Sequence, residues 1–193
     1  AGYDGGGSSE GILNNCTLSG NTAEYGGGSF RGTLNNCTLT GNTAAYSGGG
    51  SRWSTLNNCI LIANTANYGG ATDQGTIVNC TLIHNTSKSG PCGANNSTLI
   101  NCIVWDNTRG GMPYNYGGGT INYCNSDPSP SGTGNISADP LFVDATNGDY
   151  RLQAGSPCID AGSNDYVTTE TDLDGNPRKV GTVDMGAYEF QGE

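Results

Sequence analysis

The apolar positions of this chain recur in blocks, and neither a helical period nor a simple alternation describes them. Six cysteines mark the blocks, and consecutive ones are 21 or 22 residues apart: Cys16, Cys37, Cys59, Cys80, Cys102 and Cys124. An aliphatic residue lies three positions before each of the first five, at Leu13, Leu34, Leu56, Ile77 and Leu99. Another lies two positions after, at Leu18, Leu39, Leu61, Leu82 and Val104. A fixed period of this length is typical of solenoids, so we predict an inward-facing Leu-Cys-Leu layer in every unit.

Polar residues repeat with the same period. One asparagine column follows the cysteines by five positions, at Asn21, Asn42, Asn64, Asn85 and Asn107. A second precedes them by one position, at Asn15, Asn36, Asn58, Asn79 and Asn101, and glycine clusters open each unit. Because Asn and Gly tolerate turn and left-handed conformations, each unit is predicted to contain about three short extended pieces separated by bends. Units stacked about 4.8 Å apart would place equal amides above one another, so both asparagine columns are predicted to be hydrogen-bonded spines at corners.

Two solenoid folds fit this period. Leu13, Cys16, Leu18, Asn21 and Ala23 match the spacing of a leucine-rich repeat, but that fold needs apolar residues behind the strand to anchor a helix. Here the other half reads EYGGGSF or AYSGGGSRW, and glycine runs cannot supply that anchor. An all-β parallel β-helix of about six short coils is therefore favoured over the horseshoe.

The chain changes character near Asp127. The regular stack, 1–127, is followed by the break DPSPSGTG and by a segment, 128–193, whose short runs PLFV, YRLQ and TVDMGAYEF suggest irregular strands. Twelve of the seventeen acidic residues lie at or after Asp127. Because a repeat stack needs a polar terminal unit to block its open edge, we predict that 128–193 caps the C-terminal end.

The repeats resemble those of secreted bacterial right-handed parallel β-helix proteins, whose units often read like GGG…LNNCTLSGNTA. The tail, GNISADPLFVDATNGDYRLQAGSPCIDAGS followed by TDLDGNPRKVGTVDMGAYEF, resembles the C-terminal region of proteins labelled choice-of-anchor Q. This resemblance implies a right-handed coil and attachment at a cell surface. The repeats alone also resemble those of polymorphic outer-membrane proteins.

Composition narrows the partners. The chain has 193 residues, 33 of them Gly, only 12% charged residues and a formal charge of −10. Nucleic-acid binding relies on clustered Lys and Arg, so we expect no nucleic-acid partner. No run approaches the roughly 18 apolar residues of a membrane span, and we expect none. Acidity, few lysines and richness in Asn, Thr and Gly favour a secreted or cell-surface location.

The cysteines are predicted to remain thiols. Side chains stacked in register have Cβ atoms about 4.8 Å apart, beyond the usual disulfide range, so Cys16 to Cys102 should behave as a buried column of small hydrophobes. Cys92 falls outside the column. Cys124 and Cys158 are a candidate pair between the last coil and the tail.

The sequence offers little catalytic chemistry. Glu10, Glu24, Asp73 and Asp106 do not share columns, so the two facing carboxylates of a glycosidase are not predicted. His84 and Asp106 do share a column, beside Trp105, and could form a base and its orienting acid, although an exposed turn pair is the favoured interpretation. In TDLDGNP, the oxygens of Asp172, Asp174 and Asn176 have the spacing of a calcium loop, but the distal Glu is missing, and a plain Asp-Gly turn is favoured. No catalytic residue, metal or cofactor is assigned.

One surface has binding character. Six and seven residues before successive cysteines lie aromatic, cationic and planar polar groups, here called the strip: Phe30, Arg31, Arg52, Trp53, Asp73, Gln74, Asn95 and Asn96. Such groups suit sugar faces or a protein partner, whereas the plainer interpretation is a solvated outer face of a sheet.

The sequence therefore predicts a non-enzymatic extracellular structural or adhesive protein. A carbohydrate-active enzyme, such as a polysaccharide lyase or glycoside hydrolase, and a passive sugar-binding module are the alternatives. Because the first coil begins without an atypical capping segment, its edge is expected to be bare, and we expect end-to-end self-association into fibres, with truncation of a larger surface protein as the alternative.

Overall fold

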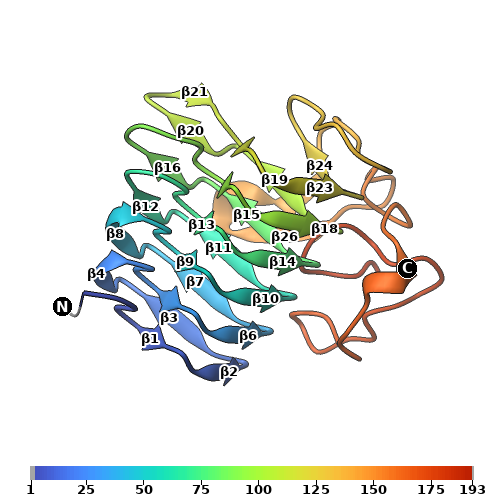
Figure 1. Cartoon of the computed structure of the whole chain (residues 1–193). Coiled ribbons are helices and arrows are strands. Elements are labelled where there is room, and N and C mark those ends of the chain that lie inside the picture. Colours follow the sequence, from blue (N-terminus) through green and yellow to red (C-terminus); the bar gives the residue numbers. More distant parts are fainter. Residues whose placement is uncertain (1–2, 193) are drawn as a thin grey trace.

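The chain folds as a right-handed parallel β-helix with almost no helix, as the sequence predicts, and the computed structural model describes residues 3–192 (Figure 1). It has about five turns, where about six coils were expected. Each complete coil has four short strands, and equivalent strands of successive coils pair in parallel. The half of the repeat that a leucine-rich fold would need as helical backing forms sheet instead, which excludes the horseshoe.

Four six-stranded sheets run along the solenoid. Sheet I contains β1 (Ser8–Ser9), β5 (Ser29–Phe30), β9 (Ser51–Arg52), β13 (Thr72–Asp73), β17 (Ala94–Asn95) and β22 (Tyr116–Gly117). Sheet II contains β2 (Ile12–Asn14), β6 (Thr33–Asn35), β10 (Thr55–Asn57), β14 (Thr76–Val78), β18 (Thr98–Ile100) and β23 (Thr120–Asn122). Sheet III contains β3 (Thr17–Ser19), β7 (Thr38–Thr40), β11 (Ile60–Ile62), β15 (Thr81–Ile83), β19 (Ile103–Trp105) and β24 (Asn125–Ser126). Sheet IV contains β4 (Thr22–Tyr25), β8 (Thr43–Ser47), β12 (Thr65–Ala66), β16 (Thr86–Ser87), β20 (Thr108–Arg109) and the antiparallel β21 (Met112–Pro113).

The prediction of three extended pieces per coil was wrong, because a fourth short strand, that of sheet I, follows the glycine segment, which is itself hydrogen-bonded between coils. The N–H of Gly27 donates to the carbonyl of Gly48 at 3.0 Å, and a Cβ on Gly27 would lie 2.5 Å from the carbonyl oxygen of Gly49. Side chains are excluded there by the close approach of neighbouring backbones. The glycines therefore lead directly into the short strands of sheet I.

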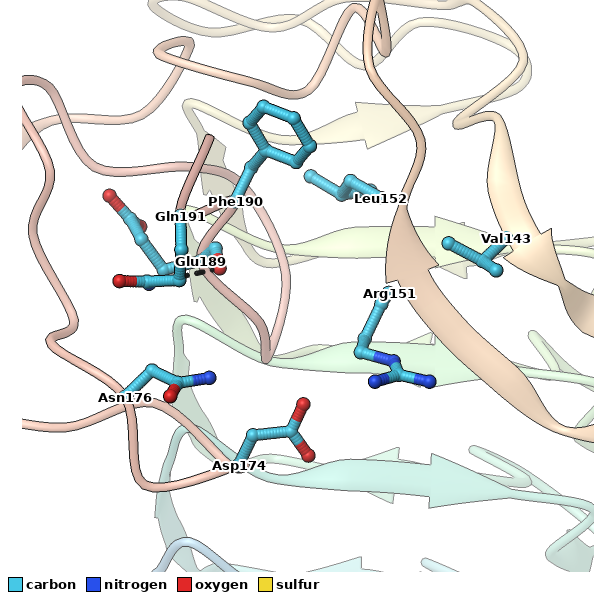
Figure 2. A pocket seen from close by; sticks show the side chains of 8 residues that line it. All are labelled: Val143, Arg151, Leu152, Asp174, Asn176, Glu189, Phe190 and Gln191. Atoms are coloured by element: carbon cyan, nitrogen blue, oxygen red, sulfur yellow. Dashed lines mark hydrogen bonds between the residues drawn. The ribbon is translucent and has the colours of Figure 1, made fainter. Parts of the chain in front are cut away.

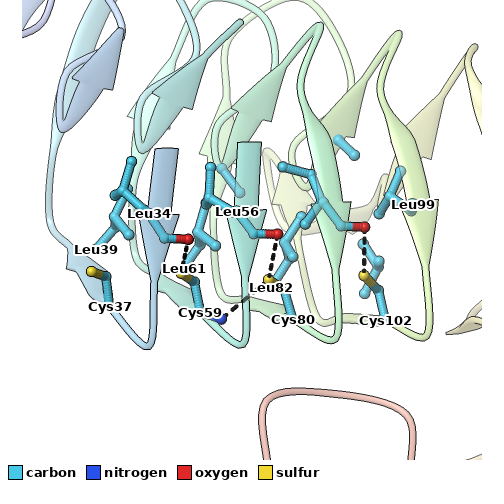
Figure 3. Packing of buried hydrophobic residues seen from close by; sticks show 14 of the residues in the cluster. Leu34, Cys37, Leu39, Leu56, Cys59, Leu61, Cys80, Leu82, Leu99 and Cys102 are labelled. Atoms are coloured by element: carbon cyan, nitrogen blue, oxygen red, sulfur yellow. Dashed lines mark hydrogen bonds between the residues drawn. The ribbon is translucent and has the colours of Figure 1, made fainter. Parts of the chain in front are cut away.

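The interior follows the predicted layer. In the second to fifth coils the leucine, cysteine and leucine positions are fully buried and lie above their counterparts (Figure 3). The thiol of Cys59 donates to the carbonyl of Leu34 at 3.5 Å, and its backbone N–H donates to Sγ of Cys80 at 3.2 Å. The thiols thus fill space and accept a backbone donor. All eight cysteines are free, so the proposed pairing of Cys124 with Cys158 was wrong: Sγ of Cys158 instead accepts from Nδ2 of Asn125 at 3.1 Å.

The first asparagine column forms an inward ladder, which confirms the predicted spine. Nδ2 of Asn64 donates to Oδ1 of Asn85 at 3.0 Å and to the carbonyl of Leu39 at 2.9 Å. Oδ1 of Asn85 also accepts the backbone N–H of Asn64. Asn115 adds a sixth member by accepting from Asn107 at 3.0 Å. Amides at these positions satisfy buried backbone groups at a bend, which an apolar residue could not do.

The second asparagine column lies at a corner and adopts the left-handed conformation, with φ between 49° and 54°. Its ladder is discontinuous. Nδ2 of Asn58 donates to Oδ1 of Asn36 at 3.2 Å, and Nδ2 of Asn101 donates to Oδ1 of Asn79 at 3.0 Å. Asn36, Asn58 and Asn101 also bind the C-terminal segment, so this column forms part of its docking surface.

Most of the C-terminal segment lies along the side of the solenoid, whereas the sequence placed it over the end. Only a short stretch covers the end: the N–H of Tyr123 donates to Thr133, and Asn125 bridges to Ile136. Then come β25 (Phe142–Asp144), η1 (Ala145–Asn147), β26 (Asp149–Leu152) and η2 (Asn164–Tyr166). The runs PLFV and YRLQ form the β25–β26 hairpin, but TVDMGAYEF contains no strand. Figure 1 shows the orange and red chain beside the coils.

Sheet III explains this placement. Its outward positions are Thr and Ser in the first two coils. In the next three coils they are apolar except for Thr81, which accepts the N–H of Ala187 in the C-terminal segment: Ile60, Ile62, Ile83, Ile103 and Trp105. Tyr150 packs on Ile60 and Ile83, and Leu152 and Met185 pack near Ile103. The segment therefore covers an outer face that would otherwise expose a contiguous apolar patch.

Candidate functional site

The strip is assembled as the spacing predicts, across three neighbouring coils. Phe30, Arg52 and Asp73 are register partners at the ends of β5, β9 and β13. Arg31, Trp53 and Gln74 are the residues that follow them, and all three have positive φ, between 52° and 56°. The strip therefore includes a left-handed corner whose side chains project outward, and Asn95 and Asn96 continue it onto the next coil.

Trp53 is the centre of the strip. The guanidinium carbon of Arg52 lies 4.2 Å from the centroid of its ring, and that of Arg31 lies 4.9 Å away. The Phe30 ring is 5.4 Å from it, and the indole Nε1 donates to Oε1 of Gln74. Two stacked guanidinium groups and the acceptor Oε1 of Gln74 hold the indole in one orientation, although 41% of the residue is exposed.

Asp73, on the coil after Arg52, holds the side chain of Arg52 in place. Its Oδ2 lies 3.1 Å from Nε of Arg52, and its Oδ1 accepts from Nδ2 of Asn95 at 2.7 Å. Asp73 is almost fully buried, and a buried charge needs a partner. The guanidinium of Arg52 is that partner. The guanidinium of Arg52 also lies 4.3 Å from the ring of Tyr25.

A depression of about 310 Å³ opens at this point, lined by Asp4, Tyr25, Phe30, Arg31, Arg52 and Trp53. Two of its lining residues, Asp4 and Tyr25, are not part of the predicted strip. Tyr25 belongs to a series of tyrosines, here called the tyrosine column, that the sequence reasoning missed: Tyr3, Tyr25, Tyr46 and Tyr68. A register shift places Tyr25 opposite Asp4 and Ser47, and Ser47 opposite Tyr68, so that these tyrosines alternate between two neighbouring positions. Their 22- and 21-residue spacing was the available signal, and the rings of Tyr25 and Tyr46 stack 5.1 Å apart.

A second depression, of about 410 Å³, lies in the C-terminal segment (Figure 2). Arg151, from β26, faces Asp174 and Asn176 on the opposite loop. Nε of Arg151 donates to Asp149 at 2.8 Å, and this contact lowers the pKa of Asp149. Burial and the nearby Asp172 raise the pKa of Asp174.

The acids behind this depression hold the fold together. Arg178 is fully buried, and its Nη2 donates to the carbonyls of Asp184 and Gly186 at 2.9 and 2.8 Å. Nη1 lies 3.5 Å from Oε2 of Glu189. Burial raises the pKa of Glu189 to about 7, although its oxygens accept the N–H groups of Val180 and Asp184. Both oxygens of Glu189 are thus used for folding.

The TDLDGNP turn is also structural. Oδ1 of Asp172 accepts the N–H groups of Asp174 and Asn176, at 3.0 and 2.9 Å, and Oδ2 accepts that of Glu189 at 3.0 Å. A carboxylate occupied by three backbone donors forms the predicted turn. Within residues 3–192, no group of three or more His, Cys, Asp or Glu side chains is arranged to hold a metal ion.

His84 and Asp106 occupy one corner column, as predicted, and both have positive φ and are exposed. The part of the chain that the structure describes contains no ion pair between them. The imidazole instead lies 6.2 Å from the ring of Tyr150 in the C-terminal segment. This geometry fits the turn pair rather than a base with its orienting acid.

Comparison with known proteins adds no assignment: no family model matches the chain, and no match is found among curated proteins. The likeness of the tail to choice-of-anchor Q regions thus depends on the quoted residues alone. Among the described residues, no helix has the length and apolar character needed to cross a bilayer.

Proposed function

We propose that this chain is a non-enzymatic, extracellular adhesive β-helix that binds carbohydrate through the strip and the adjoining depression. The observation that carries the proposal is the fixed indole of Trp53, held by two guanidinium groups and Gln74 on a rigid ladder. A preformed aromatic and polar surface loses little conformational entropy on binding, which favours recognition of a sugar. The acidic, lysine-poor composition and the resemblance of the tail support a location outside the cell.

The distribution of carboxylates favours binding over catalysis. In the strip, Asp73 is paired and buried, and Asp4 is the one acidic side chain that lines the depression. In the tail, the oxygens of Glu189 accept backbone donors, so the residue is not free to transfer a proton to a substrate. Glycoside hydrolysis needs a second carboxyl group facing the first across the bond. Asp4 has no such partner in the lining of the first depression, and in the second, where Asp174 and Glu189 both line the wall, Glu189 is held by backbone donors and by Arg178.

The proposal is tested with immobilised polysaccharides and a matched pair of variants. Trp53→Asn should abolish retention while leaving the far-UV circular dichroism unchanged, because Asn adopts the left-handed corner conformation as Asn96 does. Tyr166→Ala is the control, since Tyr166 has the same exposed fraction, 41%, but lies on η2. Equal retention of Trp53→Asn and the wild type would contradict the proposal, as would release of new reducing ends or unsaturated products by the wild type.

A second candidate function is end-to-end self-association, which the edge of the first coil favours. In residues 3–192, strands β1, β2 and β3 have a neighbour on one side only, whereas the end of β4 is covered by Tyr3 and Asp4. Leu13 and Cys16 are half-buried where Leu34 and Cys37 are fully buried, and Ile12 is 74% exposed. The chemistry of this edge fits another parallel coil, and a second copy of the chain is the partner that we propose.

The edge has a specific test. The N–H of Thr33 donates to Gly11 of the preceding coil, so the equivalent N–H of Ile12 points out of the first coil. Ile12→Pro removes that donor without touching an internal ladder bond and should lower the association seen by sedimentation velocity. Ile12→Thr, the residue of the next two coils, is the control. A wild type that is monomeric at all concentrations would contradict self-association.

A further inference from the structure

The charges around the depression indicate which class of glycan it accepts. Each arginine of the strip already has an acidic partner: Arg52 lies 3.1 Å from Asp73, and Arg31 lies 3.7 Å from Glu10. Asp4 adds a further negative charge at the lining, and the whole chain carries −10. A carboxylated or sulfated polymer would therefore meet local charges that are already compensated and a repulsive overall field.

Hydrogen-bonding capacity remains in spite of this neutralisation. Nε of Arg52 is buried against Asp73, whereas the side chain of Arg31 is 53% exposed and makes no hydrogen bond within residues 3–192 beyond its ion pair with Glu10, so Arg31 supplies the donors that a sugar can reach most easily. The carboxylate of Asp4 is exposed and can accept. Donors and an acceptor thus line one depression, and neighbouring sugar hydroxyls can use both because each hydroxyl donates and accepts.

The tyrosine column extends this surface along the solenoid. The N–H of Tyr25 donates to Tyr3, the N–H of Tyr68 donates to Tyr46, and the rings of Tyr25 and Tyr46 stack. Tyr46 and Tyr68 are 51% and 44% exposed. The stacked ring of Tyr46 therefore extends the aromatic surface from Tyr25 of the depression to the next coil, and Tyr68 is an exposed aromatic residue one coil further on, opposite Ser47. A ligand that followed them would run parallel to the solenoid axis.

We infer that the strip and the tyrosine column together bind an uncharged glycan chain lying along the solenoid axis, and not a uronate or a sulfated glycan. This inference rests on the proposed carbohydrate-binding function and adds to it the charge of the ligand and its direction. Trp53 and the two arginines hold one sugar unit in the depression, and Tyr46 and Tyr68 contact the units that follow. Affinity should then increase with chain length.

Isothermal titration with neutral hexasaccharides (cellohexaose, mannohexaose and laminarihexaose) and with hexagalacturonate tests the charge. At least one neutral ligand should bind, with an affinity that changes little between low and high salt, because no ion pair forms. Asp4→Asn keeps an acceptor oxygen but removes the rim charge, so it should increase the affinity for hexagalacturonate relative to the affinity for the neutral hexasaccharides. Tighter, salt-dependent binding of hexagalacturonate to the wild type would overturn the inference while leaving the proposed function intact.

The direction is tested by chain length. Tyr46→Ala should weaken the hexasaccharide by about 2- to 10-fold, the loss of one aromatic contact, and should not change binding of the matching disaccharide. Tyr166→Ala serves again as the control. Equal loss for both ligand lengths would contradict an axial chain. Absence of binding by every glycan, charged or neutral, would instead refute the proposed function itself.

Discussion

Asn42 and Asn64 lie one above the other inside the solenoid, and Nδ2 of Asn42 donates to Oδ1 of Asn64 at 2.9 Å. The same oxygen accepts the backbone N–H of Asn42 at 2.9 Å. Each amide therefore joins two coils twice, through its side chain and through its neighbour's backbone. The ladder acts as a buried polar network in which every member satisfies the next.

Removal of one ladder member should be costly. Asn64→Ala leaves the backbone N–H of Asn42 without its acceptor and removes the side-chain donor from the carbonyl of Leu39. It also breaks both side-chain bonds of the ladder at this coil, from Asn42 and to Asn85. Because a buried unsatisfied polar group costs about 1–3 kcal/mol, we expect a loss of about 3 kcal/mol or more in urea denaturation. Asn14→Ala, which removes one exposed bond to Asn35, should cost less than about 1 kcal/mol. Similar losses for both variants would show that the inner ladder does not stabilise the fold.

The glycine segment gives a second prediction, in which steric overlap and backbone strain can be separated. Gly27→Ala should prevent native stacking, because its Cβ would lie 2.5 Å from the carbonyl oxygen of Gly49. Gly41→Ala has no atom within 4 Å of its Cβ but has φ of 62°, so it should cost about 1–2 kcal/mol from strain alone. Gly41→Asn should recover part of that loss. Thermal denaturation of the three variants measures the difference, and a folded Gly27→Ala with an unchanged midpoint would contradict the close approach.

Thiol reactivity should distinguish the first coil from the rest. Cys16 is partly exposed, whereas the other seven cysteines are buried. Burial raises the pKa of Cys59 and Cys124, and it raises that of Cys158 to about 11, so these thiols are neutral at ordinary pH. A thiol titration of the native protein should therefore show at most one fast-reacting group, and the remainder only after unfolding. If fewer than eight thiols titrated in denaturant without a reducing agent, the protein would contain a disulfide, which would contradict the free thiols.

The C-terminal segment should lose stability as pH rises toward neutral. Burial raises the folded-state pKa of Glu189 to about 7, above its ordinary value of 4.5. Between about pH 4.5 and pH 7 the folded state therefore binds more protons than the unfolded state. The free energy of unfolding falls as the pH rises through this range and levels off above it. Burial also raises the pKa of Asp184, which makes the free energy of unfolding fall with rising pH in the same way. The positive charge of Arg178 opposes the rise in the pKa of Glu189.

The measurement is the unfolding midpoint across this pH range. Glu189→Gln should flatten the slope and lower stability throughout, because its amide nitrogen must face one of the two backbone donors now bound by the carboxylate. Glu170→Gln, an exposed acid of the same segment, is the control and should keep the slope. A slope unaffected by Glu189→Gln would assign the pH dependence to another group.

The site was partly predictable, and the missing parts have identifiable causes. The period places Arg52 beside Asp73 and Phe30 beside Arg52, because residues in register pair in neighbouring strands. The period does not determine side-chain conformations, and therefore not the contacts between residues of different columns. The stacking of Arg52 on Tyr25 and Trp53 was for this reason not predicted. The tyrosine column was visible in the spacing, but it lies outside the motif aligned on cysteine. Arg178 was not predicted as a buried group, since its partners, Asp184 and Glu189, are brought to it by irregular loops.

The sequence by itself determined the solenoid, its period, its buried thiol column and its asparagine ladder, because identical residues at a constant spacing have to stack in register. Each contact in that part of the chain joins neighbouring units, so the pattern of one unit specifies the next. The tertiary structure alone decided where the C-terminal segment lies. The outward change from Thr38 to Ile60 in sheet III signals a covered face, but which segment covers it depends on non-local packing of Tyr150, Leu152 and Met185. No period relates those residues to the coils they contact, so only the folded chain brings them together.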